Sequence, residues 1–216
     1  MRFLVISDLH QKKSALGWIN RNIADYKTDA VLFLGDVTNF GTYEDAIDIL
    51  KGIKSDVYFV PGNCDPVDIS DKVSGVVHSV HGKSFELGGI YFACLGGSNP
   101  TIFDTPFELS EEEIKTKLAP ISRKGMVLMT HAPSYGILDE IPSGANVGST
   151  AIRGIVDEFH PIVALSGHIH EETGIKKING TLFMNPGPAK DGYSAILTIE
   201  NGIAKAELIE PRIDIP

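Results

Sequence analysis

Residues 2–10 read RFLVISDLH, an apolar run that ends in a serine and then presents an aspartate and a histidine two residues apart. Four later runs have the same form and end shortly before Asp36, Asn63, His131 and His168. The five runs span residues 2–7, 29–34, 56–60, 125–130 and 162–166. Each is rich in Val, Ile, Leu, Phe or Met and is bounded by turn residues, which is typical of a strand buried on both faces.

Helical patterns occupy gaps between these runs. They cover residues 14–26, 42–50, 110–118 and 149–159. Ser110 and Glu113 have the spacing of a capping box, in which the side chain of each residue binds the backbone N–H of the other. The alternation of strands and helices predicts crossover connections and a largely parallel sheet.

The end of the chain follows a different pattern. Residues 173–178, 181–185, 193–200 and 203–209 have the composition of short strands. Asn179-Gly180 and Asn201-Gly202 stand at two of the turns between them, and this dipeptide strongly favours a β-hairpin. Residues 76–95 also contain short strand-like runs. We therefore expect an α/β fold with two packed, mixed sheets flanked by helices.

Length and composition set the broad class of protein. The chain has 216 residues, of which 43% are apolar and 22% charged, so we expect one folded domain over residues 1–216. No segment approaches the roughly 18 apolar residues of a transmembrane helix. The two cysteines are too few for a disulfide framework. These features predict a cytoplasmic protein with no membrane partner.

The formal net charge of −9 also limits the partners of the protein. Its basic residues occur as scattered pairs rather than as a stripe, so the surface should repel phosphate backbones. We therefore do not expect the protein to bind nucleic acid. A small anion can still bind, because bound divalent cations would reverse the local sign of the charge.

Side chains that can bind metals follow all five buried runs. They are Asp8, His10, Asp36, Asn63, His131, His168 and His170. Each motif alone is weak, because Asp, Asn and Gly are common in turns. Together they lie at the carboxyl ends of strands, where α/β sheets bind ligands, and turn formation does not explain four histidines. Such ligands suit zinc, iron, manganese, cobalt or nickel. Two ions about 3.5–4 Å apart need a shared anionic ligand, for which Asp36 is the natural candidate.

These motifs resemble those of the calcineurin-like metallophosphoesterase family. The matching residues are Asp8-x-His10, Gly35-Asp36, Gly62-Asn63-x-Asp65, His131 and Gly167-His168-x-His170. The stretches 96–100, 131–133 and 185–188 look like those of its small Icc-related phosphoesterase branch. The resemblance implies a four-layer α/β/β/α sandwich. It also implies two ligand sets, the first of Asp8, His10, Asp36 and His170 and the second of Asp36, Asn63, His131 and His168.

The function implied is hydrolysis of a phosphate ester by water that two divalent transition-metal ions activate. We expect Asp36, Asn63, His131 and Asp65 to take part in catalysis, and a small-molecule or nucleotide diester to be the substrate. Two alternatives are a nuclease of the same fold and a non-enzymatic scaffold. The charge argues against the nuclease, and the complete set of ligands argues against the scaffold.

Two positions depart from the family pattern. Phe40 stands where many members have an arginine that clamps phosphate, and Cys64 stands where many have a histidine that acts as general acid. We therefore expect neither protein phosphatase activity nor a strong proton donor. His78, His81 and His160 are expected to be structural. The natural substrate, the metal and the oligomeric state stay open, with a homodimer among the alternatives.

Overall fold

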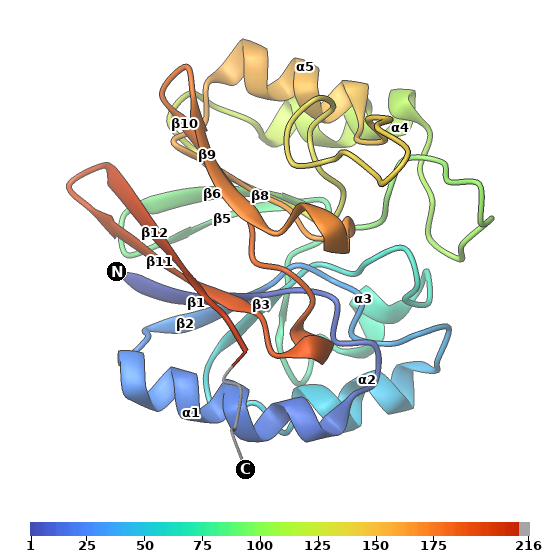
Figure 1. The fold of residues 1–216 in the computed structure, drawn as a ribbon, viewed down its shortest axis with the longest axis vertical. Coiled ribbons are helices and arrows are strands. Elements are labelled where there is room, and N and C mark those ends of the chain that lie inside the picture. The colour runs from blue at the N-terminus through green and yellow to red at the C-terminus, as the bar shows by residue number, and fades with distance from the viewer. Residues whose placement is uncertain (212–216) are drawn as a thin grey trace.

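Two six-stranded sheets pack face to face in the computed structural model, which describes residues 1–211. Helices cover the outer face of each sheet, so the molecule has four layers (Figure 1). The strand order is β12-β11-β1-β2-β3-β4 in the first sheet and β5-β6-β7-β8-β10-β9 in the second. The predicted α/β/β/α sandwich is confirmed.

The first sheet comprises β1 (Arg2–Ile6), β2 (Ala30–Phe33), β3 (Val57–Phe59), β4 (His78–Ser79), β11 (Ser194–Glu200) and β12 (Ile203–Ile209). The second comprises β5 (Lys83–Leu87), β6 (Ile90–Leu95), β7 (Val127–Thr130), β8 (Val163–Leu165), β9 (Gly174–Ile178) and β10 (Thr181–Asn185). The α-helices are α1 (Leu16–Tyr26), α2 (Tyr43–Leu50), α3 (Ile69–Lys72), α4 (Glu111–Leu118) and α5 (Thr150–Phe159). Short 3-10 turns span Lys13–Ala15, Ala119–Ile121, His170–Glu172 and Ala189–Asp191.

Both sheets are mixed, as predicted. Strands β1, β2, β3 and β4 are parallel neighbours, while β11 and β12 add an antiparallel edge. In the second sheet β6, β7, β8 and β10 are parallel, and β5 and β9 form antiparallel edges. The two Asn-Gly turns have positive φ at both residues, as a tight hairpin requires. The first hairpin joins the second sheet and the other joins the first sheet.

The core consists of three apolar layers. One lies between the first sheet and helices α1 to α3, one between the two sheets, and one between the second sheet and helices α4 and α5. Successive residues of β1 alternate between two of these layers: Phe3 and Val5 face the other sheet, whereas Leu4 and Ile6 face the helices. Because both faces of the strand are buried, its sequence shows no polar alternation.

Three helices begin at the residues that the sequence indicated. Thr42 and Ser110 form reciprocal capping boxes, and the hydroxyl of Ser149 accepts a hydrogen bond from the N–H of Ile152. The first helical segment differs slightly, because residues 13–15 form a 3-10 turn before α1 begins. Within residues 1–211, no helix is long and apolar enough to cross a membrane.

His81 lies in the turn between β4 and β5 and holds the backbone that follows β6. Its Nδ1 accepts a hydrogen bond from the backbone N–H of Gly96 (3.0 Å), so the imidazole must be neutral at that nitrogen. Burial, together with the charges of Lys117 and Lys83, lowers the pKa of His81 to about 4. Its ring also packs beside Phe107, with the centroids 5.1 Å apart.

The depressed pKa of His81 predicts a loss of stability at acidic pH. Its stabilising effect is present above the unfolded pKa of about 6.5 and is lost as the pH falls toward 4, because the unfolded chain takes up the proton first. The unfolding free energy should fall between pH 7 and pH 5 in both proteins, but by about 1–2 kcal/mol less in His81→Gln than in the wild type. Urea titrations at both pH values measure this difference. The control is His78→Gln, at an exposed histidine that stacks on Tyr58. An equal effect of both variants would contradict the assignment.

Candidate metal centre

Five loops meet where the carboxyl ends of parallel strands from both sheets come together. The N–H of Asp8 donates to the carbonyl of Gly35 (3.0 Å), which links the loops after β1 and β2. The N–H of Gly167 donates to the carbonyl of His131 (2.9 Å), which links the loops after β7 and β8. The N–H of His168 donates to the Asp8 carboxylate (3.1 Å) and so joins the two sheets.

The backbone of these loops turns through an uncommon conformation. Asp8, His10, Asp36 and His168 have φ values of 56°, 47°, 54° and 68°. Left-handed φ is unusual for residues other than glycine and costs on the order of 1 kcal/mol or more at each position. This turn lets side chains from an extended strand end point toward one common region, so part of the backbone strain lies at the candidate site.

Glycines in the motifs are required by close packing of the loops. A Cβ on Gly62 would collide with the carboxylate and backbone nitrogen of Asp36, and a Cβ on Gly35 would collide with the backbone of Gly62. A Cβ on Gly167 would lie 2.7 Å from Oδ2 of Asp8. The motif glycines therefore allow the strand ends to approach each other, beyond any role in turn formation.

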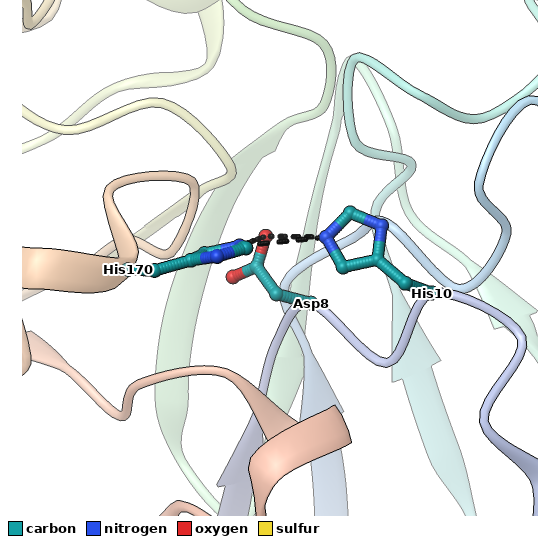
Figure 2. A group of neighbouring side chains, drawn as sticks. All are labelled: Asp8, His10 and His170. Carbon is teal, nitrogen blue, oxygen red and sulfur yellow. Dashed lines mark hydrogen bonds and ion pairs between the residues drawn. The ribbon is translucent and has the colours of Figure 1, made fainter.

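Asp8, His10 and His170 form the first group of converging side chains (Figure 2). The Oδ1 atom of Asp8 lies 3.4 Å from Nε2 of His170 and 3.9 Å from Nε2 of His10. The two Nε2 atoms are 3.4 Å apart. Asp8 is 1% exposed, whereas both histidines reach the surface, so the group lies at the mouth of the site.

A second group lies on the other side of Asp36. The Nε2 atom of His131 is 2.9 Å from Oδ1 of Asn63 and 3.7 Å from Oδ1 of Asp36. The ring of His168 lies beside that of His131, with the centroids 5.1 Å apart. The other carboxylate oxygen of Asp36 is 3.8 Å from Nε2 of His10. Asp36 thus presents one oxygen to each group, and all seven predicted residues are brought together.

Neighbouring groups orient two of these side chains. Nδ1 of His131 lies 2.7 Å from the carbonyl oxygen of Leu34. Because a carbonyl only accepts, Nδ1 carries the proton and Nε2 is left with its lone pair facing the site. The amide nitrogen of Asn63 donates to Oγ1 of Thr105 (3.1 Å), which turns Oδ1 of Asn63 inward. Sequence reasoning did not identify Leu34 or Thr105, since no motif connects them with their distant partners.

Asp65 and Cys64 differ in their surroundings. Asp65 is fully buried and accepts hydrogen bonds from the N–H of Gly62 (2.9 Å) and from the N–H and hydroxyl of Thr38 (2.8 Å each), which ties two loops together. Cys64 is partly exposed, and its N–H donates to Oδ1 of Asp36 (2.8 Å). Burial and the charge of Asp36 raise the pKa of the Cys64 thiol far above its usual range, so the thiol is neutral.

Burial sets the charge states of the cluster. It lowers the pKa of His10 to about 4 and that of His168 to about 3, so both imidazoles are neutral near pH 7. Burial, together with the charges of Asp65 and Asp8, raises the pKa of Asp36 to about 7. The adjacent carboxylate of Asp8 raises the pKa of His170. Neutral imidazoles beside buried carboxylates are the forms that bind metal ions.

The donor set fits divalent cations. Oδ1 of Asp8 and Nδ1 of His10 are buried without a hydrogen-bond partner. Three groups of side chains offer ligand atoms within 4.8 Å of one another: Asp8, His10 and His170; His10, Asp36 and Cys64; and Asp8, Asp36 and His131. A buried carboxylate among lone pairs is costly unless a cation neutralises it, so the residues present match a metal centre.

Comparison with known proteins identifies the family. Residues 1–172 match the family described as calcineurin-like phosphoesterase. This chain belongs to that family. It is therefore a metal-dependent hydrolase of phosphate esters, and the resemblance seen in the motifs is confirmed.

Individual relatives agree with this placement. The chain is 35% identical to the uncharacterized protein MJ1162 of Methanocaldococcus jannaschii over 87% of this chain and 88% of that one. It is 23% identical to the 3',5'-cyclic-nucleotide phosphodiesterase alr5338 of Nostoc sp. over 67% of this chain and 56% of that one. A dimetal phosphatase from Danio rerio has a similar fold, with a TM-score of 0.63, 12% identity and coverage of 97% and 98%.

The contact between Gly62 and Asp36 yields a test of the site. In Gly62→Ala, the added methyl group must displace the Asp36 carboxylate, so Mn²⁺ affinity should fall by about 10- to 100-fold. Calorimetric titration with Mn²⁺ measures the affinity. The control is Gly154→Ala in α5, where a Cβ meets open space and alanine favours the helix. Unchanged Mn²⁺ affinity in a folded Gly62→Ala protein would show that Asp36 does not hold the metal.

Proposed function

We propose that this protein is a phosphodiesterase that uses two divalent transition-metal ions to hydrolyse small-molecule or nucleotide diesters. The single observation that carries the proposal is the position of Asp36. Its two carboxylate oxygens lie 3.8 and 3.7 Å from Nε2 of His10 and Nε2 of His131, which belong to different ligand groups. A carboxylate that faces two groups in this way is suited to bridge two cations.

The two groups correspond to two ligand sets. Asp8, His10, Asp36 and His170 would hold one ion, and Asp36, Asn63, His131 and His168 would hold the other. The donors are imidazole nitrogens and carboxylate or amide oxygens, which favours manganese, iron, zinc, nickel or cobalt. Bound divalent cations lower the pKa of water, orient the phosphate and stabilise the charge that develops during in-line attack.

The residues of this chain supply positioning and charge. His131 is held by the Leu34 carbonyl and Asn63 by the Thr105 hydroxyl, so neither side chain has to reorganise when a phosphate binds. Asp65 holds the loops that carry Asp36 and Asn63 in a fixed relation. Asp65 would therefore take part in catalysis through the position in which its fully buried carboxylate holds these two residues.

Cys64 favours esters with good leaving groups. A neutral thiol with a raised pKa is a weak hydrogen-bond donor and a poor source of a proton near pH 7. The site therefore supplies cations but no strong general acid at this position. The cyclic-nucleotide phosphodiesterase among the relatives supports a diester substrate.

The two-metal proposal predicts the metal content of the protein. The purified protein, reconstituted with Mn²⁺, should contain about two ions per chain and hydrolyse bis(p-nitrophenyl) phosphate. Asp36→Asn should lose more activity than His10→Ala throughout an Mn²⁺ titration, because the Asp36 carboxylate faces both groups and His10 belongs to one. Elemental analysis and initial rates provide the measurements. Full activity with one ion per chain, or a more active Asp36→Asn than His10→Ala, would disprove the bridging role.

The neutral thiol of Cys64 predicts that the rate of hydrolysis depends steeply on the pKa of the leaving group. Rates for a series of diesters should fall strongly as the pKa of the leaving alcohol rises, because no strong acid protonates it. Cys64→His should flatten this dependence, whereas the near-isosteric control Cys64→Ser should leave it steep. A linear free-energy plot of kcat/KM compares the three proteins. Shallow, parallel slopes for wild type and Cys64→His would rule out the missing acid and leave the metal chemistry intact.

A further inference from the structure

Exposed apolar side chains gather on the loops around the candidate metal centre. Five of the seven exposed large hydrophobic residues within positions 1–211 lie on loops that follow β2, β3, β6 and β7. We call these five the apolar rim: Phe40 (60% exposed), Val67 (60%), Ile102 (93%), Phe103 (76%) and Tyr135 (45%). The other two, Ile178 and Ile203, lie at the hairpins. Single exposed residues are ordinary, but a group at one site indicates binding.

Two loops of the apolar rim are joined by backbone hydrogen bonds to residues of the candidate metal centre. The N–H of Phe40 donates to the carbonyl of Cys64 (3.1 Å), which joins the loops after β2 and β3. The N–H of Phe107 donates to the carbonyl of Asn63 (3.0 Å), so the loop that carries Phe103 is anchored to a predicted ligand. Tyr135 lies four residues after the predicted ligand His131, on the loop that follows β7.

The backbone of two rim loops has a defined conformation that keeps the rim side chains exposed to solvent. Phe40 has φ of 58°, a left-handed conformation that is an outlier for a bulky residue. Next to Phe103, Asp104 also has a positive φ (50°). The carboxylate of Glu108 fastens this loop by accepting hydrogen bonds from the Thr101 hydroxyl (2.6 Å) and from the N–H (2.9 Å) and hydroxyl (2.6 Å) of Thr105. Strain that keeps an apolar side chain in solvent points to a functional constraint.

We infer that the natural substrate is a phosphate ester with an apolar organic group, and that the apolar rim binds this group while the phosphate lies at the metal centre. The inference rests on the proposed function. An ester group is the favoured occupant because the rim adjoins the predicted ligands, so one molecule can contact both. A net charge of −9 opposes docking on an anionic membrane.

Two non-hydrolysable phosphonates test the inference without turnover. Methylphosphonate and benzylphosphonate share the anionic group and differ in apolar area. Calorimetric titration of the Mn²⁺-loaded protein should show benzylphosphonate binding about tenfold more tightly, from burial of its ring on the rim. Phe40→Ser and Phe103→Ser should each reduce this ratio by about three- to fivefold. The matched control is Ile203→Ser, an exposed apolar residue at a hairpin, which should keep the wild-type ratio.

Several outcomes would overturn the inference. Equal affinity for the two phosphonates, or an unchanged ratio in both rim variants, would show that the rim does not bind the ester group, while ester hydrolysis would still support the proposed function. A dimer or a vesicle-bound form that only the rim variants disrupt would assign the surface to a second copy or a lipid. Failure of both phosphonates to bind, together with no ester hydrolysis, would remove the proposed function itself.

Discussion

The carboxylate of Asp36 is a buried anion that lies between two clusters of histidines, and its stability depends on a neighbouring positive charge. It is 2% exposed, and burial is the main cause that raises its pKa to about 7. The carboxylates of Asp8 and Asp65 add repulsion. Three buried carboxyl groups in one place are energetically costly unless a cation neutralises them. Metal binding is the simplest physical condition under which this arrangement is favourable.

The sandwich supplies the rigid frame that this arrangement requires. Each sheet is packed on both faces, so the strand ends have fixed positions and the loops between them have little freedom. Left-handed turns at Asp8, His10 and Asp36 are unfavourable locally, and the buried apolar layers offset their cost. The glycines at positions 35, 62 and 167 then let two sheets bring their loops within bonding distance.

The positions that depart from the family pattern share a physical character. Phe40 replaces a charged clamp by an apolar surface, and Cys64 replaces an ionisable ring by a neutral thiol. Both changes reduce polarity near the site while the predicted metal ligands are kept. Under the proposed function, the chemistry rests on the cations and the frame, and the surrounding loops select which esters fit.

Local sequence determined the elements and their chemistry. Apolar runs predicted the buried strands, capping residues predicted the helix starts, and the motifs at five strand ends predicted a metal site. Each of these signals lies within a few neighbouring residues. The tertiary structure decided which sheet each hairpin joins and which neighbours orient the ligands. Thr105 meets Asn63 across 42 positions of sequence, and the exposed side chains of the apolar rim gather from four separate loops. Such contacts depend on how distant strands pack, and no pattern along the chain records that packing.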